Sequence, residues 1–161
     1  MSRIPQVNLN DYLSGDASSK EKFIKDIGKG FSEIGFVAVK GHLLNDEVKE
    51  SLYKEVRQFF SLPIDIKSKY IIKGLASQRG FTPFGKEHAK GKNVGDLKEF
   101  WHFGQYVKNE PEMEDKYPEN VTVEELENFN KIGQKTYKLL EDTGRHILRA
   151  CLLYTSDAAD E

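Results

Sequence analysis

Cysteine is nearly absent from this chain of 161 residues, in which Cys151 is the only one. A single thiol cannot close a disulfide within the chain, so the fold does not depend on such cross-links. This composition fits a reducing compartment, and we expect a cytoplasmic protein. Long apolar runs are also missing, since no segment approaches the roughly 18 apolar residues of a membrane span and no signal-peptide core follows Met1. We therefore expect no membrane partner.

A strong excess of charge of either sign is absent as well. The 24 basic and 26 acidic residues give a net charge of -2. Nucleic-acid-binding proteins usually carry a marked basic excess, so this balance predicts no nucleic-acid partner. The composition, 38% hydrophobic and 31% charged, is typical of an ordinary globular domain. A dinucleotide fingerprint is missing too, because Glu33 stands where the pattern that starts with Gly28 and Gly30 needs its third glycine.

The last residues, 151–161, match residue for residue the translation of a transposase mosaic-end adapter used in DNA sequencing. Segments that derive from processing or cloning are excluded from fold reasoning. We therefore expect the native segment to be residues 1–150 and the parent protein to continue beyond Ala150. Without Asp157, Asp160 and Glu161 the acidic count falls from 26 to 23 against 24 basic residues, so the net charge becomes +1.

Strand and helix patterns alternate along the rest of the chain. Short apolar or alternating runs predict strands at residues 6–9, 36–39 and 100–107. Apolar residues at helical spacing predict three longer helices and one short helix. The first starts at Ser18 or Ser19 and ends at Gly35, the second starts after Asn45, the short one runs from Pro63 to Tyr70, and the last starts at Thr122. The sequence therefore predicts an α+β fold.

The most informative part of the sequence is an aromatic block that covers residues 79–88 and 96–104. It contains the only Trp, Trp101, and two of the four histidines, His88 and His102. Gly and Pro residues, which favour turns, lie among its aromatic residues. This combination is typical of the wall of a shaped pocket.

Four segments, in this order, resemble one enzyme family. They are IPQVNL at 4–9, EIGFVAVKGH at 33–42, FFSLP at 59–63 with KSKY at 67–70, and the aromatic block. Together they resemble the N-terminal part of the isopenicillin N synthase-like non-haem Fe(II), 2-oxoglutarate-dependent oxygenases. The resemblance covers most of residues 4–107 and, more weakly, the helix expected over 122–150. One turn departs from the family pattern, because the usual Asn-His-Gly-Ile is Gly41-His42-Leu43-Leu44 here.

The resemblance implies a fold and a chemistry for the parent protein. The family carries its reaction on a double-stranded β-helix, a jelly-roll barrel, and this chain would supply the helices and strands outside the barrel core. The implied cofactors are Fe(II) and 2-oxoglutarate, and the implied partners are dioxygen and a small-molecule substrate that is hydroxylated, desaturated or cyclised. Enzymes of the isopenicillin N synthase type use Fe(II) and dioxygen without 2-oxoglutarate, and residues 1–150 leave both possibilities open.

The sequence lacks the family's residues for holding iron and 2-oxoglutarate. The implied iron ligands are a His-x-Asp pair and a distant His, but no histidine here has Asp two positions later. Leu44, Lys90, Gly104 and Leu148 stand two positions after His42, His88, His102 and His146. The implied 2-oxoglutarate grip is an Arg-x-Ser pair, and no arginine here has Ser two positions later. We therefore expect no catalytic residue and no metal ligand in this segment, and we expect the metal site beyond Ala150.

A different metal site, built from Glu99 and His102, is also conceivable. Their Glu-x-x-His spacing occurs in di-iron helical bundles, where a helix places both side chains on one face. In the strand expected here, however, residues three apart point to opposite faces. We therefore expect His102 to be partly buried and hydrogen-bonded beside Trp101.

Substrate-binding residues are expected in the aromatic block. By the resemblance, the start of this block lies near the barrel mouth, where Arg79 is available to bind an acidic group of the substrate. Phe81 and Trp101 are the other candidates. Two alternatives stay open: Arg79 pairs with a structural carboxylate such as Asp96 or Glu99, and the two aromatic residues belong to the core.

Two functions from different classes remain. The first is the N-terminal segment of an Fe(II)- and 2-oxoglutarate-dependent oxygenase, which would be inactive by itself. The second is a non-catalytic binding or interaction module on the same scaffold. A basic loop with Lys86, Lys90 and Lys92 either steers an anionic substrate or is solvated surface.

Overall fold

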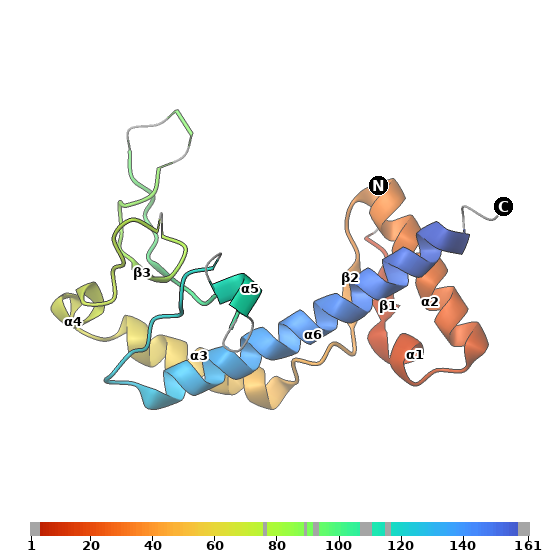
Figure 1. Cartoon of the computed structure of the whole chain (residues 1–161), viewed down its shortest axis with the longest axis horizontal. Helices are drawn as coiled ribbons and strands as arrows, with labels where there is room; N and C mark the ends of the chain where they lie inside the picture. The colour runs from red at the N-terminus through yellow and green to blue at the C-terminus, as the bar shows by residue number, and fades with distance from the viewer. Residues whose placement is uncertain are drawn as a thin grey trace. The chain divides into compact units, whose positions relative to one another are not determined.

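The structure, a computed structural model, describes residues 4–75, 77–88, 90–91, 94–106, 111–114 and 117–157. The chain forms two compact units. Unit 1 contains the residues up to Asn45 and those from Lys138 onward, and unit 2 contains the residues from Asp46 to Tyr137. The last helix, α6 (Glu127–Asp157), contributes residues to both units (Figure 1). No helix in the described ranges is long and apolar enough to cross a membrane.

Unit 1 is built on a parallel pair of short strands (Figure 1). β1 (Gln6–Asn8) pairs with β2 (Ala38–Lys40), and Val7 lies opposite Val39. Parallel strands need a crossover connection, and here it is helical. The crossover consists of α1 (Leu9–Leu13), α2 (Ala17–Lys29) and the π-helical turn η1 (Gly30–Ile34). Both strands expected in this part of the chain are therefore present, within two residues of their predicted bounds.

The crossover helix starts earlier than predicted and ends where predicted. The N-cap of α2 is Asp16, whose carboxylate accepts a hydrogen bond of 2.8 Å from the backbone N–H of Ser19. The prediction of a cap at Ser18 or Ser19 was wrong because Asp16 already satisfies this first-turn N–H. Gly35 ends η1 in the left-handed conformation, with φ of 82°, and its N–H donates to the carbonyl of Gly30.

The core of unit 1 joins the strand pair to α2 and α6. Its buried side chains are Val7, Leu9, Phe23, Ile27 and Ala150. Phe23 and Ile27 are four residues apart, so they lie on one face of α2. Gly28 sits against the ring of Tyr154, which a Cβ at that position would overlap. Tyr154 belongs to residues 151–161, and the foreign origin of that segment stays a prediction.

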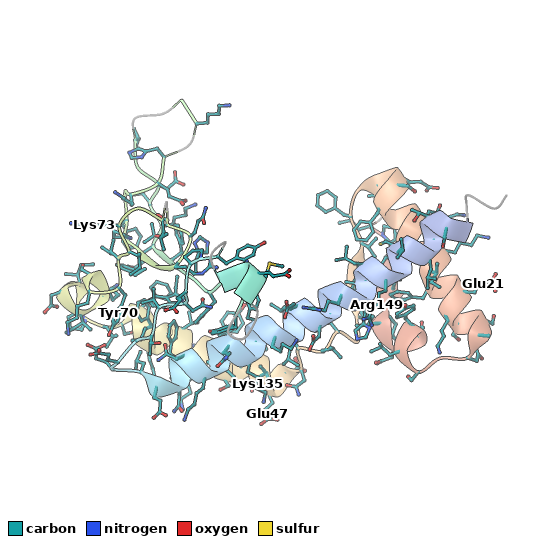
Figure 2. The ribbon with its side chains drawn as sticks, in the orientation of Figure 1. Glu21, Glu47, Tyr70, Lys73, Lys135 and Arg149 are labelled. Atoms are coloured by element: carbon teal, nitrogen blue, oxygen red, sulfur yellow. The ribbon has the colours of Figure 1, made fainter. Side chains whose placement is uncertain are left out.

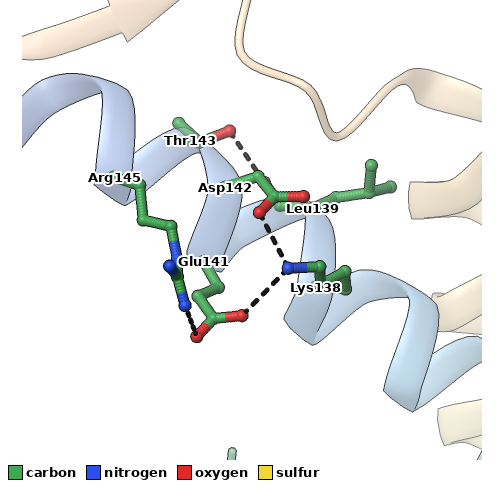
Figure 3. A network of polar contacts seen from close by, with 6 residues as sticks. All are labelled: Lys138, Leu139, Glu141, Asp142, Thr143 and Arg145. Atoms are coloured by element: carbon green, nitrogen blue, oxygen red, sulfur yellow. Dashed lines mark hydrogen bonds and ion pairs between the residues drawn. The ribbon is translucent and has the colours of Figure 1, made fainter.

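The part of α6 in unit 1 carries a polar network on its surface (Figure 3). Lys138 contacts Asp142 at 2.9 Å and Glu141 at 3.5 Å, and Arg145 contacts Glu141 at 3.1 Å. The partners are three or four positions apart, the spacing at which helical side chains meet. Their side chains are between one third and two thirds exposed, so each pair contributes only about 0.3–0.5 kcal/mol.

The same stretch of α6 has a buried polar side and an exposed apolar side. Thr143 is buried, and its hydroxyl donates to the carbonyl of Leu139 at 2.8 Å. The hydroxyl also accepts from the N–H of Leu43 at 3.2 Å, which attaches the loop after β2 to the helix. By contrast, Leu140 and Leu148 are 51% and 71% exposed.

Unit 2 contains an antiparallel strand pair and the remaining helices (Figure 1). β3 (Gly80–Thr82) pairs with β4 (Phe100–His102), and Phe81 lies opposite Trp101. The helices are α3 (Asp46–Phe60), α4 (Ile64–Ser68), α5 (Pro111–Glu114) and the first part of α6. Parallel and antiparallel strands, alternating with helices, confirm the predicted α+β class.

An aromatic cluster forms the core of unit 2. At its centre lies Phe59 on α3, which is fully buried. Its ring stacks on Phe129 at a centroid distance of 5.0 Å and meets Trp101 edge to face at 4.8 Å. The cluster also contains Phe60, Tyr70, Phe81 and Phe103. Each aromatic pair of this kind contributes about 0.5–1.5 kcal/mol beyond its buried area.

The strand predicted at residues 100–107 is shorter than expected. It ends at His102, because a side-chain amide binds the backbone just beyond it. Oδ1 of Asn120 accepts from the N–H of Gly104 at 2.7 Å, and Nδ2 donates to the carbonyl of Gly104 at 2.9 Å. These bonds replace the ladder bonds that a longer strand would make. Val107 lies outside the described residues.

The last helix starts five residues later than predicted, at Glu127 instead of Thr122. Side chains again hold the backbone before it. Asn130 accepts from the N–H of Val123 at 2.9 Å and donates to its carbonyl at 2.8 Å. The hydroxyl of Tyr70, which Figure 2 labels, accepts from the N–H of Glu124 at 3.0 Å. The carbonyl of Val123 is thus occupied by Asn130, whereas a helix that started at Thr122 would use it as an acceptor for a helical hydrogen bond.

Candidate functional site

Arg79, directly before β3, is a buried charged residue of unit 2 whose described hydrogen-bond partners are all uncharged. It is only 7% exposed. Its Nη1, Nε and Nη2 atoms donate to the carbonyl of Gln78 at 2.7 Å, the carbonyl of Pro118 at 3.1 Å and Oε1 of Gln105 at 3.3 Å. All three acceptors are neutral, so they orient the guanidinium without neutralising it. Its charge reaches Tyr106, where it partly offsets the rise in the phenol pKa that burial causes.

The guanidinium of Arg79 lies against bare backbone at Gly104. A Cβ on Gly104 would overlap the guanidinium carbon and nitrogens. The amide of Asn120 holds this backbone in place, because besides its two bonds to Gly104 it donates to the carbonyl of Gln105 at 3.2 Å. The aromatic block thus has a glycine at the point where any side chain would displace Arg79.

Asp96 and Glu99, the two carboxylates considered as partners of Arg79, form ion pairs with lysines instead. Nζ of Lys67 donates to both oxygens of Glu99, at 2.9 and 3.0 Å, and the two side chains are only 8% and 14% exposed. Asp96 pairs with Lys98 at 3.3 Å. The alternative in which Arg79 pairs with Asp96 or Glu99 is therefore wrong, because both carboxylates pair with lysines. Within the described residues, Arg79 has no carboxylate partner.

A cavity of about 420 Å³ lies beside Arg79 and is large enough for a small molecule. Its cationic lining residues are Lys73, Arg79 and Lys86, and none of the described residues that line it is acidic. Lys73 comes from the segment between α4 and β3 (Figure 2). Ile71 and Phe81 are among the apolar lining residues. The cavity therefore combines positive charge with an apolar wall.

Phe81 and Trp101, the two aromatic candidates, differ in their relation to the cavity. Phe81 is 2% exposed and belongs to the aromatic cluster, but it also lines the cavity. Its neighbour Thr82 is 1% exposed, and the Thr82 hydroxyl has no hydrogen-bond partner among the described residues. Trp101 packs in the cluster and is not among the lining residues. The alternative in which the two aromatic residues belong to the core is thus correct for Trp101 and partly correct for Phe81.

The histidines do not form a metal site with other side chains in the part of the chain that is described. No group of three or more His, Cys, Asp or Glu residues there could hold a metal ion. Glu99 is mostly buried, with 14% of its side chain exposed, and pairs with Lys67, whereas His102 is exposed, with its Nδ1 donating to the carbonyl of Ser77 at 2.5 Å. The predicted hydrogen bond of His102 is confirmed. Its predicted partial burial was wrong, because alternate strand positions face opposite sides and Trp101 occupies the core side.

Sequence reasoning did not identify Lys73 as a candidate. Nothing in the sequence separates Lys73 from the chain's other lysines, and only the turn between α4 and β3 brings it to the cavity. Lys86 was named as part of the basic loop, and the structure places it at the cavity. Lys90 is exposed, and Lys92 lies outside the described residues.

Comparison with known sequences gives consistent matches. The sequence profile of the family described as "non-haem dioxygenase in morphine synthesis N-terminal" matches residues 4–125. The chain is 34% identical over 86 residues to the 2-oxoglutarate-dependent dioxygenase imqE of Aspergillus flavus, which covers 53% of this chain and 24% of that protein. It is 27% identical over 136 residues to the 1-aminocyclopropane-1-carboxylate oxidase of Dictyostelium discoideum, which covers 83% and 36%.

Solved structures show the same likeness. A 2OG-Fe(II) oxygenase family protein from Caulobacter crescentus matches with a TM-score of 0.80 and 29% identity, over 96% of this chain and 49% of that one. A full-length Neurospora crassa protein, solved in complex with alpha-KG, matches with a TM-score of 0.76 and 21% identity, over 95% and 47%, which is a likeness of fold alone. The chain thus spans about half the length, or less, of these relatives.

Proposed function

Because the chain belongs to the family of non-haem dioxygenase N-terminal domains, we propose that it is the N-terminal segment of an Fe(II)- and 2-oxoglutarate-dependent oxygenase. The parent enzyme would couple 2-oxoglutarate and dioxygen to the hydroxylation, desaturation or cyclisation of a small molecule. The family match over residues 4–125 carries this proposal. The dioxygenases among the similar proteins, and the Caulobacter crescentus structure at 29% identity, support it.

The residues of this chain do not fit the iron centre of such an enzyme. A site for Fe(II) with open positions needs two imidazoles and a carboxylate on one face. The sequence contains no His-x-Asp pair, and the described residues contain no group of three metal-binding side chains. In this proposal the segment supplies no ligand to the iron, and the metal site lies in the rest of the parent protein.

The proposed jelly-roll barrel would also lie largely in the rest of the parent. The structure of this chain supplies only two pairs of three-residue strands among the described residues, far fewer than a barrel needs. The exposed Leu140 and Leu148 on α6 support the proposal, because a further part of the protein that covers them would bury apolar surface.

In this proposal the segment contributes part of the substrate pocket. Arg79 and Phe81 are the proposed substrate-binding residues, and Trp101, the third candidate, would act indirectly. Arg79 and Phe81 would contact the substrate at the cavity, and Trp101 would support Phe81 from the opposite position of the strand pair. The segment binds and orients, whereas the reacting atoms lie elsewhere in the parent.

One observation favours a second candidate function. Because the described residues lack a metal-binding group while a cavity is present, a non-catalytic binding module on the same scaffold would also use these side chains. The two functions differ in the sequence that the parent requires downstream of residue 150. An oxygenase needs a His-x-Asp pair, a later His and an Arg-x-Ser pair there, and a binding module needs none of them.

The test starts from the coding sequence downstream of Ala150 and continues with the encoded full-length protein. We expect the three motifs, together with Fe(II)-dependent release of succinate from 2-oxoglutarate when a substrate is present. A variant in which Ala replaces the Asp of the His-x-Asp pair is the matched control, and it should release none. Oxygen uptake that does not require 2-oxoglutarate would identify the isopenicillin N synthase type instead.

The 161-residue chain provides a second comparison. We expect no succinate release from it, with or without Fe(II). Iron-dependent consumption of 2-oxoglutarate by this chain would contradict the placement of the metal site beyond Ala150. A full-length parent without the three motifs would contradict the oxygenase and favour the binding module.

A further inference from the structure

The charge of Arg79 is the first reason to expect a specific ligand in the cavity. A buried guanidinium without a counter-charge is costly, because it loses hydration that neutral acceptors only partly replace. Arg79 is 7% exposed, and no described carboxylate pairs with it. Three of its five N–H donors bind described residues, and among these residues the other two have no acceptor and are left for a ligand. Two neighbouring oxygens of a carboxylate or a phosphate match such a pair of donors.

The other residues that line the cavity also favour an anionic ligand with an apolar part. Lys73 and Lys86 line it and are exposed, so they would raise the local concentration of anions without being buried themselves. Ile71 and Phe81 line the cavity as well and offer apolar surface to the body of a ligand. Thr82 adds a hydroxyl with no partner among the described residues.

We propose that this cavity binds the carboxylate or phosphate group of a small molecule, with Arg79 as the anchor and Phe81 against the apolar part of the ligand. Lys73 and Lys86 strengthen binding at the mouth of the cavity. As a statement about the substrate of the parent, the proposal rests on the proposed function and restricts it to anionic substrates. As a statement about binding, it requires neither iron nor 2-oxoglutarate.

Three aromatic probes of similar shape test the proposal on the 161-residue chain. Benzoate carries a carboxylate, phenyl phosphate carries a phosphate, and benzamide is the neutral isostere of benzoate. Binding is measured by titration calorimetry and by the fluorescence of Trp101, the only Trp, which lies opposite Phe81. One or both anions should bind about tenfold to a hundredfold more tightly than benzamide, as expected for a charge-assisted hydrogen bond. The stronger of the two identifies the anionic group.

The decisive variant is Arg79→Gln, with Arg57→Gln as its matched control. Arg57 is an exposed arginine of α3 that does not line the cavity. Arg79→Gln should abolish the preference for the anions over benzamide, and Arg57→Gln should leave it unchanged. Because loss of a buried arginine can disturb folding, Lys73→Gln and Lys86→Gln form a second test. Each should weaken anion binding about twofold to fivefold, the size of an exposed ion pair.

Three results would overturn the proposal. They are equal affinity for benzoate, phenyl phosphate and benzamide, equal effects of the Arg79 and Arg57 variants, and unchanged binding in both lysine variants. The outcome is independent of the oxygenase test. Anion binding by this chain with no succinate release by the parent would refute the proposed function alone, and succinate release without anion binding here would refute the cavity proposal alone.

Discussion

The buried ion pair between Lys67 and Glu99 leads to a quantitative prediction about the stability of unit 2. Lys67 lies on α4 and Glu99 directly precedes β4, so the pair joins two parts of unit 2 through residues that are 32 positions apart in the chain. Nζ of Lys67 also donates to the carbonyl of Phe60 at 3.2 Å and lies 5.4 Å from the ring centroid of Phe81. We expect Lys67→Met to lower the free energy of unfolding by about 3–5 kcal/mol.

The magnitude follows from the geometry. Two unit charges about 3 Å apart at an effective dielectric constant of about 20 attract each other by about 5 kcal/mol. Much of this attraction offsets the hydration that both groups lose when they are buried. Removal of Lys67 alone leaves Glu99 charged, 14% exposed and without its partner. The double variant Lys67→Met with Glu99→Leu leaves no charge behind, so its stability should lie within about 1 kcal/mol of the original.

Urea unfolding followed by Trp101 fluorescence measures these differences, because Trp101 belongs to the aromatic core of the same unit. Lys54→Met, at an exposed lysine of α3, is the control and should change stability by less than about 0.5 kcal/mol. A double variant that costs as much stability as Lys67→Met and Glu99→Leu measured separately and added together would refute the reasoning. So would a Lys67 variant as stable as the Lys54 control.

Three further predictions concern the surroundings of the cavity and the loop before α6. Gly104→Ala places a methyl group into the guanidinium of Arg79, so it should lower the free energy of unfolding by about 1–3 kcal/mol and weaken benzoate binding; a variant with both quantities unchanged would contradict the contact. Thr82→Val removes a buried hydroxyl without a described partner and should raise the free energy of unfolding by about 1 kcal/mol, whereas a loss of that size would indicate a partner. The hydroxyl of Tyr70 lowers the pKa of Glu125, and burial, followed by the bond to Glu125, raises the pKa of Tyr70. The stabilisation from charged Glu125 should therefore be present above its ordinary pKa of 4.5 and be lost as the pH falls through its lowered pKa in the folded protein. The stabilisation from neutral Tyr70 should be present below its ordinary pKa of 10.0 and be lost as the pH rises through its raised pKa in the folded protein. Urea unfolding at a series of pH values measures the loss of stability at acidic and at alkaline pH. An acidic loss that is identical in Glu125→Gln would contradict the role of Glu125.

The sequence predicted element types better than element ends. Apolar spacing identified α2, α3 and α6, because the buried faces of these helices follow directly from periodicity. The ends depended on single side chains that bind backbone from a distance in the chain. Asn120 ends β4 from 16 residues beyond Gly104, and no local pattern indicates such a bond. Asn130 delays α6 through Val123 for the same physical reason.

The sequence predicted that the aromatic block forms a pocket wall, but it did not predict the hydrogen-bond partners of Arg79. The aromatic block indicated a pocket wall, and Arg79 and Phe81 do line a cavity. The partners of Arg79 were not predictable, because Pro118 and Gln105 offer a backbone carbonyl and an amide that carry no charge signal in the sequence. Charge alone offered Asp96 and Glu99 as one of two alternatives for Arg79, but both carboxylates pair with lysines in the structure.

The π-helical turn η1 has a consequence for how the chain can vary in length. The bond from the N–H of Gly35 to the carbonyl of Gly30 closes a ring that contains one residue more than the ring of an ordinary α-helical bond. Deletion of one residue between Gly30 and Gly35 would restore ordinary helical spacing there while Phe23 and Ile27 keep their places in the core. A deletion inside α2 itself would instead rotate that buried face by about 100°. The turn is therefore a position where related sequences can lose a residue at a lower structural cost than inside α2.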